Sequence, residues 1–306
     1  MEYILQTFEL SKQYKKHMAV DRASMNISRG DIYGFVGENG SGKTTIIRMI
    51  TGLIFPHSGS FKLFGVENND PQICDARRKV GAVVETPSIY SNMSAFDNLL
   101  MQCEILGAGK EKIPQVLEAV GLAELLEEKK HAGDFSLGMR QRLGIAMALL
   151  GDPEFLILDE PMNGLDPAGI VEIRELILKL NRERGITFLI SSHILTELSL
   201  VANKYGIISK GHIVQEITAE ELHNQCGKHL LLRAKDPQAL LELVKKTLPD
   251  HSAVLEDDVV KISGEVELNS LLLAVIQSGN ELTSVNCKET GFEEYYLSLL
   301  GGGKNA

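Results

Sequence analysis

A glycine-rich segment, GENGSGKTT at residues 37–45, has the spacing G-x-x-x-x-G-K-[ST] of a phosphate-binding loop. It lies between an apolar run, GDIYGFVG, and a helical pattern, SGKTTIIRMITGL, as this kind of loop requires. Glycines let the backbone fold tightly enough for its N–H groups to face phosphate oxygens. The residues assigned to this nucleotide site are Gly37, Glu38, Asn39, Gly40, Ser41, Gly42, Lys43, Thr44 and Thr45.

Two side chains of this loop supply a charge and a metal ligand. Lys43 can reach the β- and γ-phosphates of a nucleotide, and the Thr44 hydroxyl can take one position on Mg²⁺. The alternative is a glycine-rich turn with an incidental lysine, which the flanking strand and helix patterns disfavour. We therefore expect a nucleotide with Mg²⁺.

Three more polar residues follow apolar runs that read as buried strands. Asp159 and Glu160 end FLILDE, and His193 follows ITFLISS. Parallel strands of an open α/β sheet end at the edge that binds ligands, so these side chains should gather there. We expect Asp159 to orient a Mg²⁺-bound water, Glu160 to polarise the attacking water, and His193 to bond the γ-phosphate and hold that water.

A second turn, FSLGM at residues 135–139, opens the helical pattern RQRLGIAMALL. A helix start leaves backbone N–H groups unpaired, so this turn can also receive an anion. It contains no lysine, however, and the chain already has a phosphate-binding loop. The sequence therefore raises the question of whose phosphate this turn would meet.

The elements that must position these residues alternate along the first two-thirds of the chain. Short Val/Ile/Leu/Phe runs alternate with helical patterns, which predicts a three-layer α/β core with a mostly parallel sheet. Residues 97–149 read almost wholly helical, which indicates a helical insert at about 86–150. Residues 216–306 have the order β-α-β-β-α-β and then a helix, which predicts a small ferredoxin-like α+β domain. The expected domains are thus 1–215 and 216–306.

Composition narrows the class of protein. A net charge of −10 argues against a nucleic-acid binder, and the apolar runs are shorter than the roughly 20 residues that span a bilayer. The N-terminus lacks the pattern of a secretory leader, so we expect a cytoplasmic protein. The four cysteines form no CxxC pair, so neither a disulfide framework nor a zinc site is indicated.

GENGSGKTT, SLGMRQR, FLILDE followed by NGLD, and SSH resemble, in order and spacing, the motifs of the ATP-binding cassette (ABC) ATPases. The resemblance covers residues 1 to about 215. It implies a P-loop NTPase fold with an antiparallel β subdomain, ATP as the nucleotide, and two cassettes paired head to tail around two ATP molecules. It further implies that Ser136 and Gly138 face the γ-phosphate held by the other subunit, that Asp166 contacts across the dimer, and that Tyr14 stacks on adenine.

Two positions differ from the common family pattern. Leu137-Gly138-Met139 replaces the usual Gly-Gly-Gln of the signature, and Glu85 in VVETPS stands where a glutamine is usual. We expect Glu85 to meet Mg²⁺ or the water and to serve coupling as well. Both departures, and the C-terminal extension, are similar to the bacitracin and lantibiotic exporter branch of the family.

The resemblance implies the ATPase subunit of an exporter for antibiotic, peptide or other amphipathic substrates. Such a subunit would drive a separate transmembrane permease from the inner face of the cell membrane, through the surface around residues 85–100 and the helical insert. One alternative is a soluble ABC protein acting on ribosomes or DNA, which usually carries two cassettes or a long coiled-coil insert. Another is an ATP-gated scaffold without turnover, which Glu160 and His193 count against.

Overall fold

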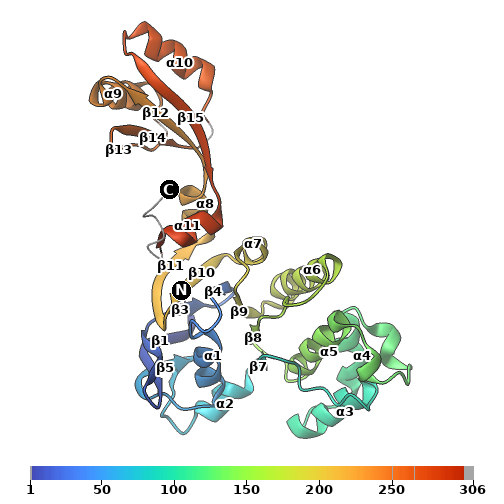
Figure 1. Cartoon of the computed structure of the whole chain (residues 1–306). Helices are drawn as coiled ribbons and strands as arrows, with labels where there is room; N and C mark the ends of the chain where they lie inside the picture. The colour runs from blue at the N-terminus through green and yellow to red at the C-terminus, as the bar shows by residue number, and fades with distance from the viewer. Residues whose placement is uncertain (1, 250, 265, 300–306) are drawn as a thin grey trace. The chain divides into compact units, whose positions relative to one another are not determined.

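The computed structural model describes residues 2–249, 251–264 and 266–299. It contains two compact units, Met1–Ile217 and Thr218–Ala306, which are described separately below. Figure 1 labels most of the helices and strands of both units.

A six-stranded sheet forms the centre of the first unit, and its strand order is β11-β10-β4-β9-β8-β7. Its five strands from β10 to β7 are parallel. Strands β4, β8 and β9 are buried along their whole length, which explains their continuous apolar sequences. The strands are β4 (Ile32–Val36), β7 (Val80–Val83), β8 (Phe155–Asp159), β9 (Thr187–Ser192), β10 (Lys204–Ser209) and β11 (His212–Thr218).

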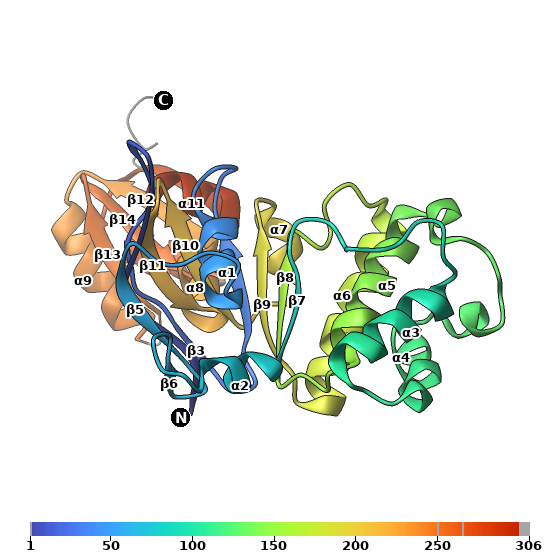
Figure 2. The same cartoon turned by 90° about the horizontal axis from the view of Figure 1, so that it is seen from below.

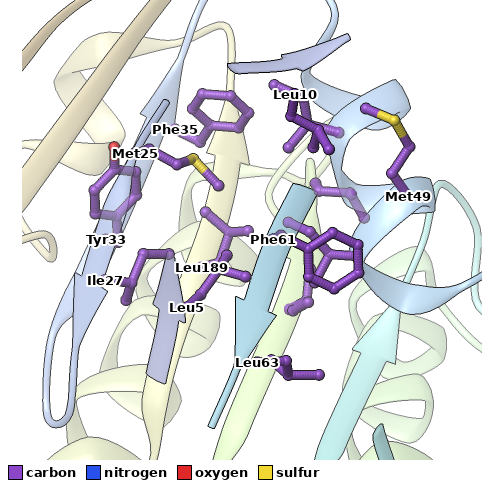
Figure 3. Packing of buried hydrophobic residues seen from close by; sticks show 14 of the residues in the cluster. Leu5, Leu10, Met25, Ile27, Tyr33, Phe35, Met49, Phe61, Leu63 and Leu189 are labelled. Carbon is purple, nitrogen blue, oxygen red and sulfur yellow. The ribbon is translucent and has the colours of Figure 1, made fainter. Parts of the chain in front are cut away.

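An antiparallel sheet packs against this core in the order β2-β1-β5-β6, with β3 paired to β1. The main hydrophobic cluster lies between the two sheets and helix α1 (Figure 3). Leu5 and Phe61 come from the antiparallel sheet, Phe35 from the six-stranded sheet and Met49 from α1. The strands are β1 (Tyr3–Tyr14), β2 (His17–Ala23), β3 (Asn26–Ser28), β5 (Ser58–Leu63) and β6 (Val66–Glu67).

Helices α3, α4 and α5 pack together, and in both whole-chain views they lie across β7 and β8 from α1 (Figures 1 and 2). This segment is less continuously helical than its sequence predicts. Gly107 ends α3 in the left-handed conformation, and three short 3₁₀ turns separate the helices. The helices of this unit are α1 (Lys43–Thr51), α2 (Ile73–Arg78), α3 (Ala95–Leu106), α4 (Ile113–Ala119), α5 (Leu137–Leu149), α6 (Pro167–Arg184) and α7 (Leu195–Leu198).

The second unit has an antiparallel four-stranded sheet of order β13-β14-β12-β15, with α9 and α10 packed to it and to each other. The β-α-β-β-α-β order confirms the predicted ferredoxin-like fold. Its core includes Leu232, Val244, Ile262 and Leu271. Its elements are α8 (Ala219–Gln225), β12 (Gly227–Ala234), α9 (Pro237–Thr247), β13 (Ala253–Glu256), β14 (Val259–Ser263), α10 (Leu268–Gln277), β15 (Leu282–Thr290) and α11 (Phe292–Leu299).

Across the residues that the structure describes, no helix is both long enough and apolar enough to span a membrane.

Candidate functional site

The phosphate-binding loop connects the end of β4 to the first residue of α1, Lys43. Gly40 and Gly42 have φ angles of 80° and 111°, which residues with a side chain rarely adopt. The Lys43 ammonium is buried and donates to the carbonyl oxygens of Gly37 at 2.6 Å and Glu38 at 3.2 Å. The loop is therefore folded around its own lysine.

Gly37 and Ser41 show how closely this loop is packed. A Cβ on Gly37 would lie 2.5 Å from the carbonyl oxygen of Ile208 and 2.5 Å from Ser41 Oγ. That hydroxyl is buried and has no hydrogen-bond partner among the described residues. A buried, unpaired hydroxyl in a glycine-rich loop fits a site whose remaining partner is a phosphate oxygen.

Asp159 and Glu160 follow one another at the end of β8, and both contact Ser191. Asp159 is 2% exposed, and its Oδ1 accepts a 2.5 Å hydrogen bond from Ser191 Oγ. The backbone N–H of Glu160 donates to the same hydroxyl at 2.9 Å. Ser191, at the end of β9, thus joins both acidic residues, a role that the sequence did not reveal. The sequence shows only that a serine pair, Ser191-Ser192, precedes His193.

Both carboxylate oxygens of Glu160 are occupied. Oε1 lies 3.3 Å from Lys43 Nζ, and Oε2 lies 2.7 Å from His193 Nδ1. The backbone at Glu160 has a φ of 51°, the left-handed region that costs a non-glycine residue conformational energy. The structure thus brings Lys43, Glu160 and His193 into one chain of polar contacts, as expected for strand ends that meet at one edge of the sheet.

The oxygen donors at this edge fit Mg²⁺ chemically. Asp159 provides a buried carboxylate at the end of β8, and Thr44 provides a hydroxyl in the first turn of α1. Mg²⁺ prefers such hard oxygen ligands and completes its shell with waters and nucleotide phosphates. Ser41, with its unpaired hydroxyl in the same loop, fits a phosphate-bearing ligand here.

Glu85 lies in the loop after β7 and also has left-handed backbone geometry, with a φ of 62°. Its Oε1 is 2.5 Å from Nη2 of Arg48 on α1, and both side chains are partly exposed. The structure therefore shows Glu85 in an ion pair, which a glutamine at this position could not form. Arg48 was not singled out from the sequence, because nothing in the local pattern links it to Glu85.

Ser136 begins α5 as its N-cap, and its Oγ accepts a 3.2 Å hydrogen bond from the backbone N–H of Met139. Ser136 and Leu137 are exposed, and the turn lies beside the NGLD loop. A Cβ on Gly138 would be 3.8 Å from Leu165 Cδ2, and one on Gly164 would be 3.3 Å from Leu137 Cδ2. The signature turn and the NGLD loop thus form one surface.

Asp166 and Tyr14 have local partners in the structure. Asp166 caps α6 by accepting a 3.0 Å hydrogen bond from the Gly169 N–H, and it is exposed. Tyr14 ends β1 with 41% of its surface exposed, and Lys12 Nζ lies 5.5 Å from its ring centroid. An exposed aromatic ring of this kind can stack on a nucleotide base.

The phosphate-binding loop and the Ser136 turn lie at the starts of two different helices. Helix α1, which follows the phosphate-binding loop, and α5, which Ser136 begins, lie on opposite sides of β7 and β8 (Figures 1 and 2). The loop and the Ser136 turn therefore open helices on different sides of these strands.

A cavity of about 1020 Å³ lies among α1, α2, β7, α3 and α5. Leu53, Ile105 and Leu106 contribute exposed apolar surface to it. Arg77 and Lys112 contribute basic side chains, and Lys112 is paired with Asp152. Val84 and Thr86, the neighbours of Glu85, also line it. The sequence pointed to the region around residues 85–100 but did not show a cavity.

Comparisons with known proteins match both the motifs and the fold. The family model described as "ABC transporter" matches residues 20–163, and a model of an AAA domain matches residues 131–199. The bacitracin transport ATP-binding protein BcrA of Bacillus licheniformis is 42% identical, over 99% of this chain and 99% of that protein. The lantibiotic transport ATP-binding protein SrtF of Streptococcus pyogenes is 42% identical, over 70% of this chain and 90% of that protein.

Solved structures give the same result for the first unit. CbiO1 from Clostridium perfringens, part of the ABC transporter complex cbiONQ, is 26% identical with a TM-score of 0.66, over 81% of this chain and 97% of that one. A dimeric bacterial ABC transporter cassette, MJ0796, is 25% identical with a TM-score of 0.63, over 70% of this chain and 98% of that one. With identity to BcrA that extends over nearly the whole chain, this protein belongs to the ATP-binding subunits of ABC transporters, which hydrolyse ATP to power transport.

Proposed function

We propose that this chain hydrolyses ATP, as a head-to-tail homodimer at the inner face of the cell membrane, to drive a separate transmembrane permease that exports peptide antibiotics. The observation that carries the catalytic part is the chain of Lys43, Glu160 and His193 at the end of the parallel strands. Such a chain joins a phosphate-binding cation, a general base and a histidine, which are the groups that phosphoryl transfer to water needs.

In this proposal the nucleotide activates its own catalyst. Lys43 and His193 now occupy both oxygens of Glu160, so the carboxylate is not free to accept a proton. Phosphate oxygens of ATP compete with Glu160 for the Lys43 ammonium and the His193 imidazole, because both groups bind anions. Binding of ATP thereby releases Glu160, which then orients and deprotonates the attacking water.

The remaining residues of the site bind the nucleotide and Mg²⁺ and orient the catalytic groups. The backbone N–H groups of residues 37–45 cradle the phosphates, and Tyr14 stacks on the base. Thr44 and Asp159 would hold Mg²⁺, with Glu85 as a further candidate, and the ion would offset charge on the phosphates. Ser191 fixes the Asp159 carboxylate and the Glu160 backbone relative to each other, because its hydroxyl forms a hydrogen bond with each.

A second copy of the chain completes the site. Ser136 and Gly138 belong to a helix start that contains no lysine; Ser136 is exposed and Gly138 is half-buried. A head-to-tail pair would bring this turn, with Asp166 beside it, to the phosphate held by the partner's loop. A solved cassette that is itself dimeric supports the pairing of two copies, and the head-to-tail orientation is part of our proposal.

The cavity beside Glu85 is our candidate docking site for the permease. Its apolar rim and positive charges suit a short helix with apolar and acidic residues. The Glu85–Arg48 ion pair connects its lining to α1, whose first residue is Lys43. Docking at the cavity can therefore influence the phosphate-binding loop.

Peptide antibiotics are proposed as substrates because the relatives named above are a bacitracin and a lantibiotic transport protein. The same comparisons favour export over action on ribosomes or DNA. The test is co-expression of the chain with its membrane subunit in a sensitive strain. Wild type should raise the inhibitory concentration of bacitracin or a lantibiotic, and Glu160→Gln should not. An unchanged inhibitory concentration for both peptides would contradict the substrate class.

The docking site has its own experiment, a pull-down of the membrane subunit from solubilised membranes. Ile105, 69% exposed on α3, lines the cavity, whereas Leu200, 60% exposed, does not. Ile105→Glu should lose the membrane subunit and Leu200→Glu should retain it. Equal capture by both variants would contradict docking at this cavity.

A further inference from the structure

Glu197 lies four residues after His193, on the single turn of α7. Its side chain is partly buried, and its Oε2 is shielded from solvent without a hydrogen-bond partner among the described residues. An unpaired buried carboxylate oxygen is costly, so its persistence suggests a role in another state of the site.

The surroundings of Glu197 connect it to the hydrolytic residues. Burial raises the pKa of its carboxyl above that of an ordinary glutamate, His193 lowers it and Glu160 raises it further. His193 and Glu160 are the titratable groups that act on Glu197 in the described part of the chain. Glu197 therefore lies within electrostatic reach of both residues, although no step described above uses it.

His193 needs a second acceptor during turnover. In the structure Glu160 Oε2 is 2.7 Å from His193 Nδ1 and 3.4 Å from the His193 backbone nitrogen. Once Glu160 turns towards the attacking water, the imidazole loses this contact. A histidine that binds the γ-phosphate through one nitrogen must be oriented through the other, because the two nitrogens are linked by one ring.

The nearby serines are already engaged. Ser191 donates to Asp159 and accepts from the Glu160 N–H. Ser192 accepts from the Ile194 N–H at 2.9 Å and donates to the Ile194 carbonyl at 3.3 Å. Glu197 differs from both because one of its oxygens is unpaired.

We propose that Glu197 is a positioning residue that accepts the hydrogen bond of His193 when Glu160 releases it. This inference rests on the proposed hydrolytic roles of Glu160 and His193. It adds a second acceptor for the imidazole: His193 is hydrogen-bonded to Glu160 before Glu160 turns to the attacking water, and to Glu197 afterwards.

The test compares steady-state ATP hydrolysis by the full-length chain carrying Glu197→Ala or Glu197→Gln. We expect Glu197→Ala to lower kcat about tenfold, the usual cost of losing a group that orients a functional histidine. The KM for ATP should stay within about twofold, because the proposal gives Glu197 no part in binding the nucleotide. Glu197→Gln should recover most of the loss, since its amide oxygen can accept the same bond. Glu175→Ala, which alters an exposed glutamate on α6, is the matched control.

The pH profile of kcat supplies a readout that a purely structural role would not move. Because burial raises the pKa of Glu197, this carboxylate takes up a proton at a higher pH than an ordinary glutamate does. Protonation makes it a weaker hydrogen-bond acceptor for His193. In wild type, kcat should therefore fall on the acid side of the profile as Glu197 is protonated. Glu197→Gln cannot be protonated in this range, so its profile should lack this fall in kcat.

Two results would overturn the proposal. One is a wild-type kcat for Glu197→Ala. The other is a parallel fall of kcat and Tm in both variants with an unchanged pH profile, which would show a structural role only. Glu160→Gln is assayed beside them: turnover that survives this substitution refutes the base itself, and with it the need for a second acceptor.

Discussion

The two edges of the six-stranded sheet both carry ion pairs, but of different kinds. At the edge where β7 and β8 begin, Glu154 lies 2.7 Å from Arg29 and 3.0 Å from Lys79, and Arg29 also pairs with Glu2 at 3.0 Å. These side chains are partly or largely exposed. At the edge where the strands end, Lys43, Glu160 and His193 form a chain in which Lys43 is 5% and Glu160 19% exposed.

The difference separates solvated charges at one edge from buried charges at the other, which can meet a ligand. The amino-edge pairs are solvated and relaxed, and such pairs contribute little to stability. At the carboxyl edge the charges are withdrawn from water, the backbone of Glu160 is strained, and Ser41 and Glu197 have unpaired buried oxygens. Backbone strain and buried polar atoms without hydrogen-bond partners, gathered at one edge of a sheet, are typical of a functional site.

The largest effect is expected at the carboxyl edge, from Glu160→Gln. This change keeps the size of the side chain but removes the base, so ATP hydrolysis should fall by about 10²- to 10⁴-fold. Nucleotide binding should persist, because residues 37–45 are unaltered. Rate measurements with parallel ATP-binding titrations check this prediction, and a turnover rate close to wild type would contradict the choice of base.

An intermediate effect is expected from Glu85→Gln, which breaks the exposed ion pair with Arg48. Thermal unfolding should show a stability loss below about 1 kcal/mol. Stimulation of hydrolysis by the membrane subunit should fall several-fold, since residues that couple distant sites typically modulate them by about 0.5–2 kcal/mol. Arg48→Gln should reproduce the loss, and the double variant should add little to it. Wild-type hydrolysis and transport in Glu85→Gln would contradict the coupling role.

The smallest effect is expected at the amino edge, from Glu154→Gln. Hydrogen bonds from Arg29 and Lys79 lower the pKa of Glu154, so its contribution to stability is present at neutral pH and is lost as the pH falls through that lowered value. The variant should lose less than about 1 kcal/mol near neutral pH. Its difference from wild type should vanish in acid, and ATP hydrolysis should not change. Denaturant unfolding across pH measures this, and a growing difference in acid would contradict the assignment.

Much of this organisation follows from patterns along the chain. Gly37–Thr45, Asp159 and His193 were placed at one sheet edge because each follows an apolar run, and parallel strands end together. The element order after residue 216 likewise came from the alternation of short apolar runs and helical patterns.

The rest depends on contacts that no local pattern contains. Ser191 bridges Asp159 to Glu160, and Arg48 holds Glu85. Both depend on side-chain directions across neighbouring elements. Residues 97–149 are not continuously helical, because Gly107 and Gly121 adopt positive φ angles. The composition of the segment does not reveal which of its glycines do so. The roles assigned to Ser136, Gly138, Asp166, Tyr14 and Glu85 remain predictions.

The central claim is that the Ser136 turn of one copy completes the phosphate site of another. Its most direct test is to mix two inactive variants, Lys43→Ala and Ser136→Arg, and to measure ATP hydrolysis. A mixed dimer carries both defects in one site and leaves the other site intact, so random pairing should restore about a quarter of wild-type activity. Each variant alone should stay inactive, and Ser136→Arg should still bind ATP. A mixture as inactive as its two components would contradict the shared site.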